Sequence, residues 1–193
     1  MSKLSSIIHL FPEGTAKPEG AFLQVNLVGK EIQASPPVGT NLAPKNCTLI
    51  GFQDEEKSTE ALKCMTEKAE RSFDVHSGSE KVLKKSGLDV SSVKAVLVIN
   101  GCPTIEDFRT MMDDPAMEPL ILSFGEQKGL IVKHFLLGKW GQNIGGGCYF
   151  FECEEDIEAY LSSEFWTKCV TETPWENVTY EKYSVEFMSN GTY

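Results

Sequence analysis

The fold is decided by a stretch near the middle of the chain, Val93-Lys94-Ala95-Val96-Leu97-Val98-Ile99-Asn100. This run is almost entirely apolar and rich in β-branched residues, which is typical of a strand covered on both faces. Gly101-Cys102-Pro103 ends the strand. Thr104 then caps a predicted helix whose inner stripe consists of Ile105, Phe108, Arg109 and Met112.

Outward from this stretch, strands and helices alternate to the end of the chain. The pattern predicts strands at 130–137, 148–152 and 178–187, and a helix that opens at the acidic triplet Glu154-Glu155-Asp156. The order over residues 93–188 is therefore β-α-β-β-α-β. This order predicts an α+β fold, a ferredoxin-like antiparallel sheet with two helices on one face.

Such a unit leaves the second face of its sheet uncovered, so it needs a partner sheet. Residues 21–92 predict strands at 21–28 and 47–52, a long helix at 56–73 and a short one at 79–86, whereas residues 1–20 suit an N-terminal arm. The N-terminal half is either a degenerate ferredoxin-like half that closes an α+β barrel within one chain, or an extension on a homodimer. The residues leave both open.

Charge and composition exclude several classes of function. The chain has 193 residues with 18 Lys+Arg and 28 Asp+Glu, a formal net charge of −10, which disfavours nucleic acid and acidic membrane surfaces. No apolar run suits a membrane helix or a secretory signal. The six cysteines lack metal-ligand spacing and are expected to be free thiols in a reducing compartment, so we expect a cytoplasmic protein.

Three segments of the C-terminal half match the pattern of a known family: Gly129-Leu130-Ile131-Val132-Lys133, Ile144-Gly145-Gly146-Gly147-Cys148-Tyr149-Phe150-Phe151 and Ile157-Glu158-Ala159-Tyr160-Leu161. In that family a Gly-aromatic-apolar-x-Lys strand precedes an Ala-Gly-Gly-x-Tyr-apolar-Phe strand and an acidic helix ending in Ala-Tyr-Leu. This half resembles the YdhR-type mono-oxygenases of the dimeric α+β-barrel superfamily. Leu130 stands where the family has an aromatic residue, and the N-terminal half has no counterpart in these short proteins.

The resemblance implies a pocket between the sheet and its helices that binds an aromatic or polyketide-like molecule. Related barrels oxygenate, cyclise, isomerise or decarboxylate such substrates, often without a metal or flavin, so we expect no cofactor. A base, a dry cavity and correct orientation suffice when the substrate stabilises its own carbanion. The alternatives are a carrier that binds an apolar ligand without catalysis, and a solidly packed barrel that serves assembly.

Two residues are the candidates for catalytic roles. His134 is the only histidine of the C-terminal half and is predicted to be the base, with a buried core histidine and a haem ligand as alternatives. Tyr149 follows the three glycines and is predicted to donate a hydrogen bond to the substrate, with a packed cross-strand aromatic as the alternative. Lys133 and Glu152 alternate with apolar neighbours in their strands, which suits either a charged pair at the barrel seam or positions at a solvent-exposed sheet edge.

The expected pocket walls are aromatic. They are Trp140, Tyr160, Trp166, Phe151 and Phe108, although aromatic residues at such spacing also suit a packed core. The acidic clusters lie at predicted helix ends, where the helix dipole explains them, so no metal site is expected.

Overall fold

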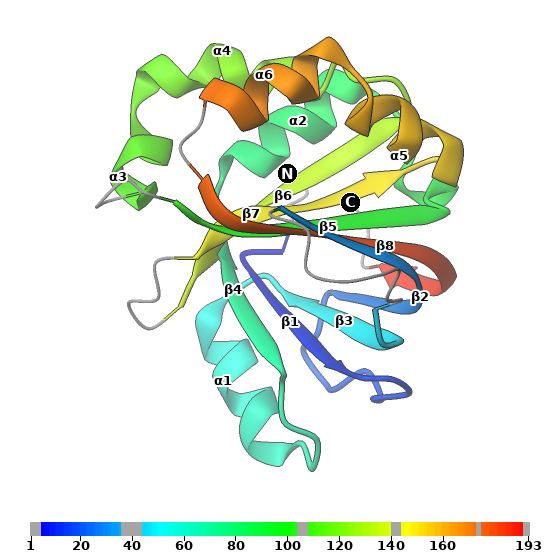
Figure 1. The fold of residues 1–193 in the computed structure, drawn as a ribbon. Coiled ribbons are helices and arrows are strands. Elements are labelled where there is room, and N and C mark those ends of the chain that lie inside the picture. Colours follow the sequence, from blue (N-terminus) through cyan, green and yellow to red (C-terminus); the bar gives the residue numbers. More distant parts are fainter. Residues whose placement is uncertain (1–4, 36–43, 104–107, 140–143, 173–174, 191–193) are drawn as a thin grey trace.

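The computed structural model describes residues 5–35, 44–103, 108–139, 144–172 and 175–190. Eight antiparallel strands close into a barrel in the order β1-β3-β2-β8-β5-β7-β6-β4 (Figure 1). The strands are β1 (Ile7–Pro12), β2 (Leu23–Ser35), β3 (Cys47–Phe52), β4 (Arg71–Val75), β5 (Ala95–Pro103), β6 (Leu130–Gly138), β7 (Gly145–Phe151) and β8 (Trp175–Asn190). The helices are α1 (Glu55–Cys64), α2 (Gly78–Ser86), α3 (Phe108–Asp113), α4 (Glu118–Phe124), α5 (Glu154–Leu161) and α6 (Glu164–Glu172), with 3₁₀ turns at Val90–Ser92 and Pro115–Met117.

Closure of the sheet corrects the predicted fold class. A ferredoxin-like open sheet has two free edges, but here β8 pairs with β2 and β6 pairs with β4. The β2–β8 pairing runs from Leu23–Asn190 to Ser35–Val178, so no edge of the C-terminal strands is left to bind a second sheet. One chain supplies all eight strands, which settles how the barrel is closed.

The N-terminal half differs most from expectation. Residues 7–12, expected in an arm, form β1, which pairs with both β3 and β4 and buries five of its six residues. The helix expected at 56–73 ends at Cys64, and residues 71–75 form β4 instead. Tertiary pairing overrides the helical spacing because β4 fills the gap between β1 and β6.

The C-terminal elements follow the predicted order, with shifted ends. The strand expected to start at residue 148 begins at Gly145, and the final strand extends to Trp175–Asn190. Thr104 and Ile105 of the predicted helix lie outside the described residues, and α3 begins at Phe108. None of the six cysteines, all of which lie in the described residues, forms a disulfide bond. No helix in the described part of the chain is long and apolar enough to cross a membrane.

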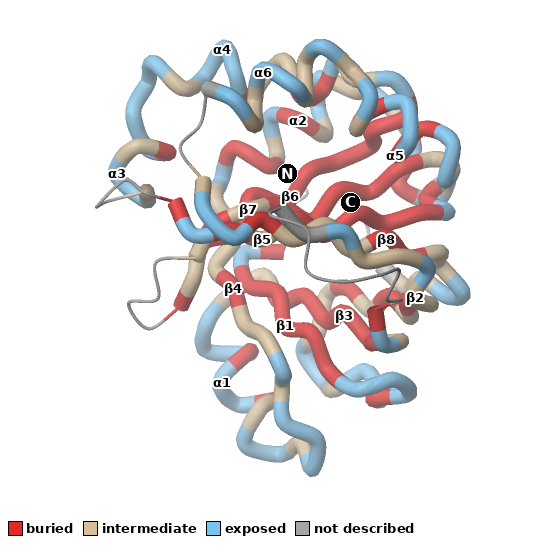
Figure 2. The backbone as a smooth tube through the Cα atoms, in the orientation of Figure 1, coloured by how far each residue is buried: buried red, intermediate tan, exposed pale blue. Residues whose placement is uncertain are grey.

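Two apolar cores lie on opposite faces of β5, β6 and β7, and Figure 2 shows these strands buried along most of their length. One core fills the barrel interior and includes Leu136 and Phe150. The other lies outside the barrel, beneath α2, α4, α5 and α6, and includes Phe135 and Leu137. Successive residues of a strand point to opposite faces, so from Val132 onward, beyond an irregularity in the register, neighbours in β6 point to different cores.

Candidate functional site

A cavity of about 350 Å³ lies between the outer face of the sheet and the helices of the C-terminal half. We call it the helix-side cavity. Its walls are mainly aromatic and methionine side chains: Phe108, Met111, Met112, Met117, Phe124, Trp166, Trp175 and Tyr180. An apolar enclosure of this kind with a few polar groups is typical of a small-molecule site.

The polar group at the base of this cavity is Lys133 of β6, which is only 6% exposed. Its Nζ lies 3.5 Å from the centroid of the Phe124 ring, 4.2 Å from that of Phe135 and 4.8 Å from that of Tyr149. Within the described part of the chain Nζ has no ion-pair or hydrogen-bond partner. Burial lowers the pKa of Lys133 to about 7, because an apolar site disfavours the ammonium form.

The strand register explains how Lys133 reaches the cavity. Lys133 pairs with Tyr149 of β7, and Phe135 pairs with Gly147, so all four residues share one face. A Cβ at Gly147 would lie 2.6 Å from Cε2 of Tyr149 and 2.8 Å from Cε of Lys133. A Cβ at Gly145 would lie 2.6 Å from Cε1 of Phe108. The glycines therefore leave space for the side chains that form the cavity.

Two tyrosines add hydroxyl groups to the cavity wall. Tyr149 is 2% exposed, and burial raises its pKa, so the phenol stays neutral and can donate a hydrogen bond. Burial also raises the pKa of Tyr180, whose ring contacts Trp166 at a centroid distance of 5.9 Å. The cavity thus combines a titratable amine with neutral hydroxyl donors.

Tyr149, the predicted hydrogen-bond donor, and the five predicted wall residues fall into three groups. Tyr149, Trp166 and Phe108 line the cavity. Tyr160 and Phe151 pack in the layer behind it, with Tyr160 at ring-centroid distances of 5.4 Å from Tyr149 and 5.6 Å from Phe151. Trp140 lies outside the described residues.

His134, the predicted base, lies on the opposite face of β6 from the helix-side cavity. Its ring packs edge-on against Phe150 of the interior core at a centroid distance of 5.1 Å. Both ring nitrogens are buried without a hydrogen-bond partner among the described residues, and burial lowers the pKa of His134 to about 4. The structure therefore places a neutral imidazole inside the barrel and the neighbouring amine in the cavity.

Sequence reasoning did not single out Lys133 as a site residue. The expected charged pair with Glu152 is not formed in the described part of the chain. One signal could have found it: Lys133 interrupts an otherwise apolar strand from Leu130 to Leu137, and it ends the first segment of the family pattern. A lysine is almost never fully buried without a partner, so its place at the centre of a buried strand marks it as a candidate site residue.

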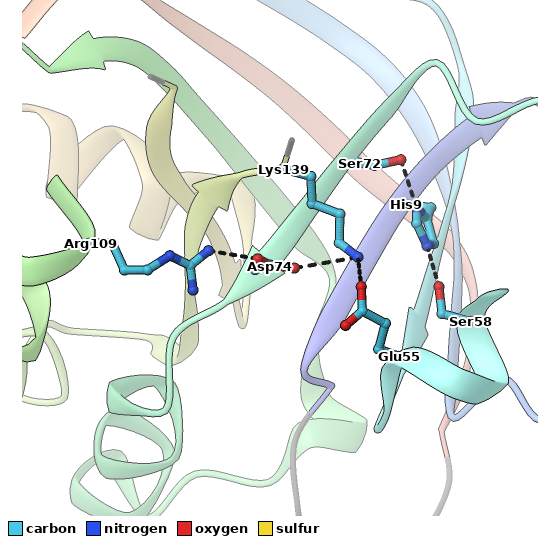
Figure 3. Close-up of polar contacts among 7 residues, drawn as sticks. All are labelled: His9, Glu55, Ser58, Ser72, Asp74, Arg109 and Lys139. Carbon is cyan, nitrogen blue, oxygen red and sulfur yellow. Dashed lines mark hydrogen bonds and ion pairs between the residues drawn. The ribbon is translucent and has the colours of Figure 1, made fainter. Parts of the chain in front are cut away.

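Ion pairs hold α3, one wall of the cavity, against the rest of the molecule. Figure 3 shows Arg109 of α3 in an ion pair with Asp74 of β4. Lys139 lies between Asp74 and Glu55 of α1 and pairs with both. The Arg109–Asp74 distance is 2.6 Å, and Asp113 of α3 lies 3.0 Å from Nε2 of His76. These contacts position Phe108, Met111 and Met112 above the sheet.

His9, also drawn in Figure 3, is a satisfied core residue. Its ring nitrogens lie 2.7 Å from the hydroxyls of Ser58 and Ser72. Burial, with a contribution from Lys139, lowers the pKa of His9 to about 4. His9 and Ser58 are 1% and 2% exposed, so a substrate cannot reach this pair. Within the described residues no group of three or more His, Cys, Asp or Glu side chains could hold a metal ion.

Comparisons with known proteins identify solved structures that share this fold. No protein-family model and no curated protein matches the chain. A solved structure of a candidate monooxygenase from Fusobacterium nucleatum is similar, with a TM-score of 0.64, 7% identity, and coverage of 98% of this chain and 96% of that one.

Two further solved structures share the fold. An anthrone oxidase-like protein has a TM-score of 0.59 and 12% identity, covering 100% of this chain and 95% of that one. A candidate monooxygenase from Lactobacillus acidophilus has a TM-score of 0.58 and 8% identity, covering 96% of each chain. The likeness spans both halves of this chain, so it is not confined to the C-terminal half. The chain shares its fold, along nearly its whole length, with monooxygenase-like structures.

Proposed function

We propose that this protein is an enzyme that binds an aromatic carbon acid in the helix-side cavity, deprotonates it with Lys133 and allows the carbanion to react with O₂ without a cofactor. The observation that carries the proposal is the buried amine of Lys133, which has no ion-pair or hydrogen-bond partner among the described residues and whose pKa is lowered to about 7. A general base is most effective when its pKa lies near the working pH. The monooxygenase-like neighbours support the same reaction class.

Proton transfer is the first step. The neutral amine of Lys133 takes a proton from a methylene carbon held between aromatic rings, and the electron pair stays on the substrate as a delocalised carbanion. The new ammonium group forms an ion pair with this anion, and the nearby faces of Phe124 and Phe135 favour it further. The positive charge is therefore produced at the place where the negative charge develops.

Oxygen then acts as the electron acceptor. The carbanion transfers electrons to O₂, a C–O bond forms, and the Lys133 ammonium returns its proton to give a hydroperoxide. Loss of the remaining C–H hydrogen with cleavage of the O–O bond releases water and leaves a ketone, so that R₂CH₂ + O₂ gives R₂C=O + H₂O. In this proposal the neutral hydroxyl of Tyr149, a residue of the cavity wall, donates a hydrogen bond to the developing oxygen.

The test is the oxidation of anthrone, with O₂ uptake and ketone formation measured above the uncatalysed rate. Wild-type protein should consume one O₂ per substrate, with a rate that rises through about pH 7 as Lys133 loses its proton. Lys133→Met should lower the rate by about 10²-fold or more. His134→Leu, on the other face of β6, should retain most of it. A fully active Lys133→Met protein would refute the proposal. Loss of activity in His134→Leu alone would indicate that His134, and not Lys133, is the base.

A carrier function is the second candidate, and the methionines of the cavity wall favour it. Met111, Met112 and Met117 are flexible and adapt to ligands of different shape. A carrier would bind anthrone in the same assay without O₂ uptake and release it unchanged.

A further inference from the structure

A polar bridge crosses the barrel interior. It joins Arg71 of β4 to Glu181 of β8. In the closed order of eight strands, three strands separate β4 from β8 on each side, so the two strands lie opposite each other. The Arg71 guanidinium donates hydrogen bonds of 2.9 and 2.7 Å to Glu181. The Tyr183 hydroxyl donates a third hydrogen bond to Glu181, of 2.6 Å. Because β4 and β8 face each other across the barrel, this bridge divides the interior.

A second cavity, of about 600 Å³, lies at one end of the barrel beside this bridge. We call it the mouth cavity. Arg71 forms part of its wall, together with Asn100 of β5, Thr179 of β8, Ile144, and the segment from Met65 to Phe73. The register pairs Asn100 with Thr179 on one side and Gly146 on the other. This pair lies two residues beyond the Val98–Glu181 pair, and therefore on the same face of the sheet. The cavity is separate from the helix-side cavity, with which it shares no lining residue.

Asn100 is the unexplained group in this cavity. Both Nδ2 and Oδ1 of its side chain are buried, and neither has a hydrogen-bond partner within the described residues. Buried amide groups in native proteins nearly always have partners. An amide without one, beside a cavity large enough for a small molecule, points to a partner from outside the chain.

The surroundings define the chemistry of that partner. Glu181 engages both terminal nitrogens of Arg71, so the half-buried guanidinium is already neutralised. The other charged lining groups, Glu67, Lys68 and Glu70, are exposed at the rim. No unpaired buried charge among the described residues of the wall would attract an ion, and Leu62, Phe73 and Ile144 supply apolar surface.

We propose that the mouth cavity is a second ligand site, which binds a neutral planar molecule with adjacent N–H and C=O groups, such as a lactam. Both amide atoms are covered in the free protein, so the proposal requires the Asn100 side chain to turn toward the cavity on binding. The lactam C=O then accepts from Nδ2, and the lactam N–H donates to Oδ1. The two unpartnered atoms are thereby satisfied together. This site is independent of the chemistry assigned to Lys133.

The probes are 2-quinolone and 1-methyl-2-quinolone, which differ in the N–H donor, and binding is measured by isothermal titration calorimetry. The wild-type protein should prefer 2-quinolone by about fivefold, the worth of one hydrogen bond. Asn100→Leu should abolish this preference. Ala69→Phe, which narrows the cavity from its outer wall, should weaken the binding of both probes. Lys133→Met should leave the affinity for both probes unchanged.

Three outcomes would overturn the proposal: no saturable binding of either probe, a preference that persists in Asn100→Leu, or one that is lost in Lys133→Met. Near-UV circular dichroism confirms that each variant is folded. Should Asn100→Leu fail to fold, Ala69→Phe decides the case, because unchanged binding of both probes to this variant would exclude the mouth cavity.

Discussion

At the scale of single residues, the amine of Lys133 combines two opposing effects. Removal from water disfavours its charged form, whereas the faces of Phe124, Phe135 and Tyr149 favour it. The first effect is the larger, because the pKa falls from 10.5 to about 7. Lys133 therefore destabilises the fold at neutral pH, a cost consistent with its proposed role as the base.

This imbalance predicts a pH-dependent stability difference between the wild type and Lys133→Met. Between about pH 7 and 10.5 the unfolded chain binds the Lys133 proton and the folded chain does not. The free energy of unfolding of the wild type should therefore rise with pH relative to the variant, by at most about 1.4 kcal/mol per pH unit. Urea unfolding of both proteins from pH 6 to 10 measures the difference, and a flat difference would show that Lys133 is not buried as described.

Gly147 is the second residue on which the cavity depends. Gly147→Ala would bring a Cβ within 2.6 Å of the rigid ring of Tyr149 and 2.8 Å of the Lys133 side chain. We expect a loss of about 1–3 kcal/mol in the free energy of unfolding, from overpacking, together with weaker binding of anthrone. Chemical denaturation and fluorescence titration measure the two effects. Wild-type values for both would mean that the strand accommodates the methyl group and that Gly147 is not required.

Lys133 and His134 show why the site was only partly predictable. Histidine is the usual choice of base near neutral pH because of its unperturbed pKa, but burial lowers the pKa of His134 to about 4 and that of Lys133 to about 7. The sequence indicates that both residues lie in an apolar strand. It does not show which face of β6 meets the helices, and that face determines which of the two reaches the cavity.

At the scale of elements, α3 is held by contacts that contribute little to stability. The side chains of Arg109 and Asp113 are 53% and 65% exposed, so their pairs with Asp74 and His76 are expected to contribute at most about 1 kcal/mol each. Their role is to position the helix that carries Phe108, Met111 and Met112 over the cavity.

The double variant Arg109→Met/Asp113→Asn should therefore affect ligand binding more than stability. We expect the Kd for anthrone to rise several-fold because one wall of the cavity is less well positioned, while the melting temperature changes by only a few degrees. Lys168→Met, which removes an exposed ion pair within α6, is the matched control and should leave the Kd unchanged. Equal effects of both variants on the Kd would argue against a positioning role.

The two N-terminal strands missed from sequence have different physical explanations. Ile7-Ile8-His9-Leu10-Phe11 is apolar but short, and the Pro and Gly residues that follow it suggest a loosely attached segment. Phe73 continues the helical spacing of Leu62, Met65 and Ala69, yet it lies in the barrel core whereas those three pack against the cluster outside β1 and β3. Local spacing cannot reveal pairing between residues distant in sequence.

At the scale of the whole molecule, β1 closes the barrel and should be essential. Ile8 is 1% exposed within the interior core, so Ile8→Ala should lower the free energy of unfolding by about 2–5 kcal/mol. Phe187→Ala, at a ring that is 49% exposed, should have a much smaller effect. Guanidinium unfolding of both variants provides the measurement. A negligible effect of Ile8→Ala would support the arm expected from sequence and contradict the closed barrel.

Closure by a single chain also predicts how the molecule unfolds. The β2–β8 and β4–β6 pairings join the strands before residue 93 to those after it, so separating either group would expose a long row of unpaired backbone groups and the interior core. We therefore expect one cooperative transition. All three tryptophans lie in the C-terminal half, so their fluorescence reports on that half, whereas far-UV circular dichroism reports on every strand. The two probes should give coincident urea curves, and a dichroism change that persists after the fluorescence transition would show that the two halves unfold separately.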